Sequence, residues 1–244
     1  MSALYHEFIY QPLYNGLIFL VGSLTFVDAG VAVVILTVIV KVILFPLSKK
    51  AIMTQLAMKE VQPEVNRLKE KYKDNKEEQA RRMMALYKEK GVNPFSGILL
   101  LILQLPILFA LYHVFMSGLP AVNQAELYSF VKVPDHISTT FLGLFDISDT
   151  KNILLAFLVG LTQFIQAKIM IDTRGSDTSG EKGTFEADFA RSMNTQTKYV
   201  LPIFIGVISY TLSGALAIYW ITSNLFSIGQ EMFLQRTRRN VRNP

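Results

Sequence analysis

Residues 30–47 read GVAVVILTVIVKVILFPL, a run of eighteen residues that is apolar except for Thr37 and Lys41. A bilayer core about 30 Å thick takes about 20 apolar helical residues to cross, at a rise of about 1.5 Å per residue. Lys49 and Lys50 then end the apolar run with two charges. The stretch therefore predicts a membrane-spanning helix, the first span of a membrane protein.

The composition of the whole chain agrees with a membrane protein. Over 244 residues, 51% are hydrophobic and 18% are charged, which is more apolar than an ordinary soluble domain. The net charge of +5 is concentrated, because the segment from Lys49 to Lys90 holds twelve Lys or Arg and seven Asp or Glu. The rest of the chain is balanced, so we expect no basic nucleic-acid surface and no sequence-specific nucleic acid binding.

Three further apolar blocks predict four more spans. Ser96–Met116 has the length of a second span, and Asn152 to Ile171 has the length of a third. The last block, Tyr199 to Leu234, is too long for one crossing. Ser213 and Gly214 divide it, which predicts a short fourth span, a tight turn and a fifth span.

Residues 8–27 are apolar but carry a polar stripe. Glu7, Gln11 and Asn15 recur every four residues, and Pro12 interrupts the first turns. This pattern favours an amphipathic helix that lies in the membrane interface. A spanning helix is the alternative, because no charged residue lies between Glu7 and Asp28.

The distribution of Lys and Arg predicts the orientation. The first 28 residues contain none and the loop 117–151 contains two, whereas the 49–90 segment contains twelve. The loop 172–198 contains four, and four more follow Leu234. Cytoplasmic segments carry the excess of Lys and Arg, so the N-terminus is expected outside and the C-terminus in the cytoplasm.

The segment between the first two spans has two amphipathic patterns separated by Asp74 and Asn75. Apolar residues at helical spacing are Val61, Val65, Leu68 and Tyr72, and then Ala80, Met83, Met84 and Tyr87. Two helices paired as an antiparallel hairpin are predicted, with Gly91 as the left-handed residue after the second. The hairpin is either a connector that rests on anionic lipid or a docking arm for an incoming chain or targeting factor. Its methionines favour docking, because Met surfaces adapt to varied apolar partners.

The predicted fold class is thus an all-α membrane protein with five transmembrane helices, a cytoplasmic helical hairpin and an N-terminal interfacial amphipathic helix. Its parts are residues 1–28 as the outer-interface helix, 29–48 as the first span, 49–93 as the hairpin, 94–236 as four further spans with a cytoplasmic loop at 172–197, and 237–244 as a short basic tail.

Lys41 is the most unusual residue within the spans. It lies eight residues before Lys49, or about 12 Å into the membrane by helical rise. An ionisable group there either faces a polar cavity or extends its stem to the interface. Uncharged polar residues recur in the other spans, including Gln104, Thr162, Gln163, Tyr219 and Asn224. These groups either join helices by hydrogen bonds or line the same cavity as Lys41.

The sequence offers little for catalysis. It has no cysteine, no GxSxG or HExxH motif and no paired carboxylates within a span, so no catalytic residue, metal or cofactor is expected. A small secondary transporter or channel is an alternative, because a charged cavity also suits a carrier. Carriers usually contain two related halves, whereas this chain has a hairpin in one half only.

Several motifs in order resemble the YidC/Oxa family of membrane protein insertases. They are VKVILFPLSKKA, KEVQPEVNRLKEKYKDN, MMALYKEKGVNPFSG, LQLPILFALYHVF and SGALAIYWITSNLFSIGQ, and together they extend over about residues 30–236. The resemblance implies the short form of the family, without a large extracytoplasmic domain, located in the bacterial plasma (inner) membrane.

The resemblance also implies a hydrophilic groove that is open to the cytoplasm and to lipid and closed on the outer side. By their match to the family's motifs, the groove residues are Lys41, Gln104, Gln163, Trp220, Thr222 and Asn224. The family usually has Arg where this chain has Lys41. Lys keeps the positive charge but cannot form the two parallel hydrogen bonds that Arg makes to a carboxylate. The implied partners are nascent membrane proteins, membrane lipids, the Sec translocon, and the ribosome or signal recognition components.

Overall fold

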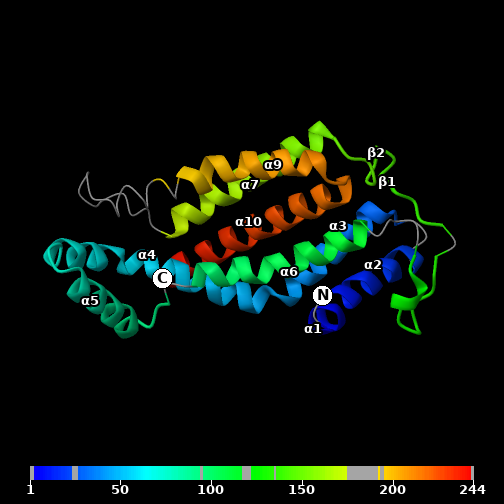
Figure 1. The fold of residues 1–244 in the computed structure, drawn as a ribbon. Helices are drawn as coiled ribbons and strands as arrows, with labels where there is room; N and C mark the ends of the chain where they lie inside the picture. The colour runs from blue at the N-terminus through cyan, green and yellow to red at the C-terminus, as the bar shows by residue number, and fades with distance from the viewer. Residues whose placement is uncertain are drawn as a thin grey trace. The chain divides into compact units, whose positions relative to one another are not determined.

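A computed structural model describes residues 3–23, 27–93, 96–116, 122–134, 136–174, 192 and 195–242. Most of these residues are helical (Figure 1). The elements in chain order are α1 (Ala3–Tyr5), the π-helical η1 (His6–Tyr10), α2 (Gln11–Ser23), α3 (Ala29–Ile43), α4 (Phe45–Lys71), α5 (Lys76–Glu89), α6 (Ser96–Met116), the 3-10 turn η2 (Gln124–Glu126), β1 (Thr140–Phe141), β2 (Phe145–Asp146), α7 (Ile153–Arg174), the π-helical η3 (Gln196–Val200), α9 (Leu201–Thr211) and α10 (Gly214–Arg242).

The described residues form two compact units, each with its own contacts. The first unit consists of Met1–Leu44, Leu101–Gln163 and Ile203–Phe226. The second consists of Phe45–Leu100, Phe164–Pro202 and Ser227–Pro244.

In the first unit, α2 packs against α3 and its polar stripe binds a loop. Asn15 is buried, donates to the carbonyl of Glu126 at 2.8 Å and accepts from the amide of Tyr128 at 2.7 Å. Gln11 donates to the same Glu126 carbonyl at 3.3 Å, and His6 lies 3.0 Å from the Glu126 carboxylate. Gln11 and Asn15 of the stripe thus satisfy backbone groups of η2 and of the residue after Leu127, and the location of this helix in the interface remains a prediction.

The 138–151 loop contains the only strands among the described residues, the exception to an otherwise helical fold. β1 and β2 pair antiparallel with Phe141 opposite Phe145 (Figure 1). Main-chain hydrogen bonds connect the loop to the N-terminus of α3 and to the turn between α9 and α10. They are Ala29 N–H to Ser138 O (2.8 Å), Ala215 N–H to Ile147 O (2.9 Å), Gly214 N–H to Asp149 O (3.0 Å) and Lys151 N–H to Tyr210 O (2.8 Å).

Two glycines of the first unit permit close backbone approach. A Cβ at Gly214 would lie 3.2 Å from the Cα of Ile147, so only glycine fits without a shift between α10 and the 138–151 loop. A Cβ at Gly206 would lie 3.2 Å from the Ala156 carbonyl and 3.5 Å from Gly160, where α9 crosses α7. Small residues at such a crossing are typical of helix packing in membranes.

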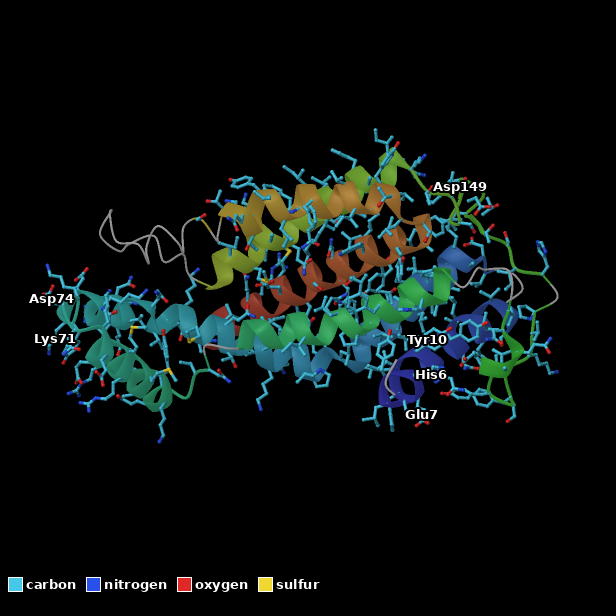
Figure 2. The ribbon with its side chains drawn as sticks, viewed as in Figure 1. His6, Glu7, Tyr10, Lys71, Asp74 and Asp149 are labelled. Carbon is cyan, nitrogen blue, oxygen red and sulfur yellow. The ribbon has the colours of Figure 1, made fainter. Side chains whose placement is uncertain are left out.

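In the second unit, α4 and α5 form a helical hairpin whose turn lies near Lys71 and Asp74 (Figures 1 and 2). Its core residues are Val61, Val65, Leu86 and Val92, with Ala57, Met58, Leu68, Met83 and Tyr87 against them. Met84, which we placed in the apolar stripe, is 54% exposed, and Leu86 packs instead.

The end of α5 has the geometry of a Schellman motif. Gly91 has a φ of +64°, as predicted, and its amide bonds the Lys88 carbonyl at 3.2 Å. The Val92 amide bonds the Tyr87 carbonyl at 3.0 Å, and both side chains belong to the hairpin core. Lys90 and Glu64 form an ion pair at 2.7 Å, which raises the pKa of the Lys90 amine. The helices of the hairpin are thus joined by apolar packing and by charge.

The first predicted span ends earlier than the sequence pattern suggested. α3 stops at Ile43, and Leu44 separates it from α4, which begins at Phe45. Pro46 explains the break, because it has no N–H to donate to the Val42 carbonyl and its ring crowds that carbonyl. The hairpin helix therefore begins four residues before the predicted Lys49.

Among the described residues, one helix is long and apolar enough to cross a membrane, Ile153–Ile171 within α7. A second is obtained if α3 and α4 are counted together as one broken span. A shorter apolar helix extends over Gln104–Phe115. The described residues are mostly helical, which is consistent with an all-α membrane protein, and the number of five spans remains a prediction.

Candidate functional site

The candidate site lies within the first unit and begins with Lys41. Lys41 is in the last turn of α3, where the negative end of the helix dipole favours a cation. Its neighbours Val42 and Ile43 are 55% and 67% exposed, so this part of α3 has an apolar outer face. The Lys41 ammonium points elsewhere and donates to the Oε1 of Gln104 on α6, at 3.3 Å. This hydrogen bond directs the ammonium toward α6, and the cavity that Lys41 would line remains a prediction.

Gln104 continues the polar contact to a third helix. Its Nε2 donates to the hydroxyl of Tyr219, which lies on α10 and is 2% exposed. Tyr219 also hydrogen-bonds the side chain of Ser223, one turn further along α10. A continuous polar chain from Lys41 through Gln104 to Tyr219 therefore joins α3, α6 and α10. Tyr219 was among the polar residues of the spans, but its role as the connecting group was not predicted.

A second polar contact joins α7 and α10. The Nδ2 of Asn224 donates to the Oγ1 of Thr162 at 3.2 Å, and both side chains are buried. The Thr162 hydroxyl in turn donates to the carbonyl of Leu158 at 2.8 Å. This arrangement is a buried interhelical hydrogen bond of the kind that holds membrane helices together. Asn224 therefore has a direct structural role in addition to the groove role that we predicted for it.

The remaining predicted groove residues are half-buried in the same unit. Gln163 lies on α7, next to Thr162, and Thr222 lies on α10. Trp220 packs against the apolar cluster of Leu155, Val159 and Ala217. Because successive helical residues are about 100° apart, Tyr219 reaches Gln104 while Trp220 turns toward α7. The structure thus brings Lys41 and Gln104 into direct contact and leaves Trp220 in apolar surroundings.

The 138–151 loop is bonded to the ends of helices that carry the site, at the start of α3 and the start of α10. Asp28 is central to it, because its carboxylate accepts from the amide of Val31 at 2.8 Å and from the amide of Leu142 at 2.9 Å. Phe141 packs against Gly30, where an added Cβ would lie 2.4 Å from its ring. Asp146 accepts from the Ser148 amide and the Thr139 hydroxyl, and these bonds lower the pKa of its carboxyl group. The loop is therefore fixed to the start of α3 by main-chain and side-chain hydrogen bonds and by the packing of Phe141.

The second unit has a separate polar contact at the base of the hairpin. Gln230 on α10 donates to the hydroxyl of Ser48 at 2.7 Å, and Arg238 donates to the Met53 carbonyl at 3.0 Å. Arg238 also pairs with the Glu60 carboxylate at 2.9 Å. These contacts hold the end of α10 to the first half of α4. Sequence patterns could not predict them, because the partners are about 180 residues apart.

The sequence of this chain matches a family model over most of its length. The model is described as the 60Kd inner membrane protein, and the match extends over residues 20–241. The chain belongs to this family. It is the YidC/Oxa family of the sequence resemblance, whose members are bacterial inner membrane proteins.

Curated members of the 60Kd inner membrane protein family are similar over most of both chains. A protein of Fusobacterium nucleatum named membrane protein insertase YidC is 33% identical over 232 residues, which are 94% of this chain and 98% of that protein. A protein of the same name from Clostridium tetani is 35% identical over 209 residues, 85% of this chain and 81% of that one. One from Clostridium perfringens is 35% identical over 211 residues, 85% of this chain and 79% of that one. These relatives give no support to the transporter alternative.

Proposed function

We propose that this chain is a membrane protein insertase, which receives nascent membrane proteins and transfers their apolar segments into lipid. Membership of the 60Kd inner membrane protein family supports this function, as do the names of its relatives. The single structural observation that carries the mechanism is the polar chain from Lys41 through Gln104 to Tyr219. It joins three helices at a depth where apolar contacts would otherwise be expected.

The polar chain lowers the barrier for a polar tail to enter the membrane. An unpaired charge in hydrocarbon costs several kcal/mol, or about 2.5 to 3.5 kcal/mol on insertion scales. At an effective dielectric near 20, a substrate carboxylate about 4 Å from the Lys41 ammonium gains on the order of 4 kcal/mol before desolvation. These two quantities are similar, so capture is transient and the tail can be released. Gln163, Thr222 and Asn224 are proposed to provide further hydrogen bonds to such a tail.

We assign five spans to α3, α6, α7, η3 with α9, and the first part of α10. α9 together with η3 extends over residues 196–211, about 24 Å of helix, which is short for a full crossing. α10 has no Asp, Glu, Lys or Arg from Gly214 to Gln230, and its charges begin at Glu231. The distribution of Lys and Arg supports an outside N-terminus and a cytoplasmic C-terminus.

In this orientation the 138–151 loop lies on the outer side and the hairpin lies in the cytoplasm. Main-chain bonds from the loop to α3, α9 and α10 support a groove that is closed outside. The hairpin is proposed to dock incoming chains or targeting factors, and the partly exposed Met83 and the exposed Met84 support this role. The Sec translocon and the ribosome or signal recognition components are the partners that we propose for the whole protein.

The function is tested by reconstitution of the full chain into vesicles. A short single-span substrate is added, and protease protection of its tail measures insertion against vesicles that lack the protein. We expect protection that rises with the amount of the chain. The substrate tail could be protected equally in empty vesicles and in vesicles that hold the correctly assembled chain. If so for every substrate length, the insertase proposal would be wrong.

A further inference from the structure

The tip of the 138–151 loop exposes two leucines on a strained turn. Leu142 is 63% exposed and Leu144 is 75% exposed, between the half-buried Phe141 and Phe145. Leu142 and Gly143 both have positive φ, at 49° and 74°, and the Leu144 amide bonds the Phe141 carbonyl at 2.9 Å. Such a turn normally contains Asn, Asp or Gly, because the left-handed region is unfavourable for a side chain like Leu. In water this tip would combine backbone strain with exposed apolar surface.

The rest of the turn is held firmly, so the leucines point outward as a consequence of the fold. The rings of Phe141 and Phe145 lie 5.6 Å apart, and Phe141 packs on Gly30. The Leu142 amide donates to the Asp28 carboxylate, which also caps α3. The aromatic pair therefore faces the protein while the leucine pair faces away from it.

The position of the tip relative to the spans is limited by its bonds. Ile147 accepts from the amide of Ala215 in the first turn of α10, and Leu144 is three residues before it. Three extended residues reach at most about 10 Å. The polar headgroup layer on each side of the hydrocarbon is about 5 to 7 Å thick. The tip is thus within reach of this layer at the end of the helices.

The apolar outer surface of the helices continues up to the same loop. Ile153 and Leu154, in the first turn of α7, are 77% and 60% exposed. Two residues before Ile153, the Lys151 amide is bonded to the Tyr210 carbonyl near the end of α9. Lipid chains that cover Ile153 therefore end next to the loop from which the tip projects.

We propose that Leu142 and Leu144 anchor the 138–151 loop in the headgroup and upper acyl layer of the membrane. The occupant of this surface is lipid, not a protein partner. Burial of the two side chains offsets the strain at Leu142 and fixes the depth of the helix ends. The anchor depends on the chain being a membrane protein but does not depend on its insertase activity.

The test uses single cysteines, because the chain has none of its own. Leu142→Cys and Leu144→Cys are compared with Leu161→Cys, a 42% exposed site within α7, and with Asp74→Cys, in the turn of the hairpin. Each full-length variant is reconstituted singly in lipid nanodiscs and labelled with an environment-sensitive fluorophore. Nitroxides near the headgroup and near the end of the acyl chain report its depth, and iodide reports its contact with water.

We expect the two tip labels to be quenched most by the shallow nitroxide and to be protected from iodide. The Leu161 label, about 12 Å further along α7 than Ile153, should respond to the deep nitroxide, and the Asp74 label only to iodide. Tip labels that behave like the Asp74 label would overturn the proposal. Tip labels that are protected from iodide only when one nanodisc holds several copies of the chain would indicate contact between copies. This result would also overturn the proposal.

A probe-free measurement excludes an effect of the fluorophore. The unlabelled cysteines are reacted with a charged, membrane-impermeant thiol reagent. Reaction at Leu142→Cys and Leu144→Cys is expected to be about tenfold slower than at Asp74→Cys, because a low-dielectric layer disfavours the thiolate. Equal rates in nanodiscs would contradict the anchor, whatever the fluorescence shows.

Discussion

The Lys41 ammonium donates a hydrogen bond to the side-chain oxygen of Gln104, 63 residues further along the chain and 3.3 Å away. Gln104 then donates to Tyr219, so it uses one end of its amide as acceptor and the other as donor. A carboxylate that approaches Lys41 competes with a neutral oxygen, and its charge adds an attraction on the order of 4 kcal/mol at about 4 Å and an effective dielectric near 20, which the amide oxygen lacks. Gln104 can therefore hold the ammonium in place and still be displaced by a substrate.

Substitution of Lys41 should affect insertion according to the charge of the substrate tail. Lys41→Arg should retain insertion, Lys41→Ala should reduce it most for acidic tails, and Lys41→Glu should be worst. The physical reason is the ion pair between a substrate carboxylate and the Lys41 ammonium. At about 4 Å it contributes on the order of 4 kcal/mol before desolvation. Protease protection is measured at equal membrane abundance, with the tail charge varied. Insertion of acidic and neutral tails by Lys41→Glu at the parent's level would show that the charge has no role.

Tyr219→Phe should weaken insertion without a preference for tail charge. The change removes the hydroxyl that accepts from Gln104 and leaves a half-buried amide without this partner, which costs about 1 kcal/mol. Tyr210→Phe is the matched control, because Tyr210 is 39% exposed on α9. Thermal unfolding in detergent and the insertion assay are both measured. A selective loss for acidic tails would mean that Tyr219 contacts the substrate charge itself.

The bond between Asn224 and Thr162 should couple α7 to α10. A double-mutant cycle with Asn224→Leu and Thr162→Val is expected to give a coupling free energy of about 0.6 to 1.7 kcal/mol, as other membrane hydrogen bonds do. The free energy of unfolding is measured in the bilayer by steric trapping. Additive effects of the two substitutions would indicate that this bond does not contribute to stability.

The ion pair of Arg238 and Glu60 should protect the first half of α4 from local opening. Arg238→Glu is expected to speed hydrogen exchange at residues 53–60, by a factor that corresponds to about 1 kcal/mol or less for a partly exposed pair. The double variant Arg238→Glu with Glu60→Arg should recover part of the protection. Full recovery is not expected, because Arg238 also donates to the Met53 carbonyl. Unchanged exchange in Arg238→Glu would argue that the contact is incidental.

Single-cysteine reporters should reveal the topology. Reporters at Gln124 and Thr150 are expected to react with an impermeant reagent in intact cells, whereas one at Asp74 should react only after the membrane is opened. The reason is the excess of Lys and Arg between Lys49 and Lys90, which favours a cytoplasmic location. Reaction at Asp74 in intact cells would reverse the predicted orientation.

Local signals in the sequence were sufficient to predict where many helices end. α6 occupies Ser96–Met116, the segment predicted as the second span, α9 and α10 are separated at the predicted break around Ser213, and Gly91 is left-handed. These ends depend on the loss of apolar periodicity and on glycine, which act over a few residues. The break at Leu44 was missed although Pro46 was in the quoted stretch, because the apolar run continued through it.

Contacts between residues far apart in the chain could not be predicted from the sequence. The polar residues of the spans could be identified from the sequence. The hydrogen bond between Lys41 and Gln104, and the one that links Gln104 to Tyr219, could not be predicted. The side chain of Asn15 donates a hydrogen bond to the carbonyl of Glu126, 111 residues away. No local pattern distinguishes such a residue from one that contacts lipid headgroups. The left-handed Leu142 was equally unexpected, since the turn is imposed by Asp28 and Gly30 from a distant part of the chain.

The 138–151 loop is joined to the helices by main-chain groups, and this gives it an unusual tolerance to mutation. Most side-chain substitutions leave an amide donor in place, so the closed end can vary in sequence without opening. Proline is the exception, because it removes the donor itself. Proline scanning should therefore find sharp sensitivity at Gly214 and Ala215, whose amides donate to the loop, and at Lys151, where a φ of 66° also excludes proline.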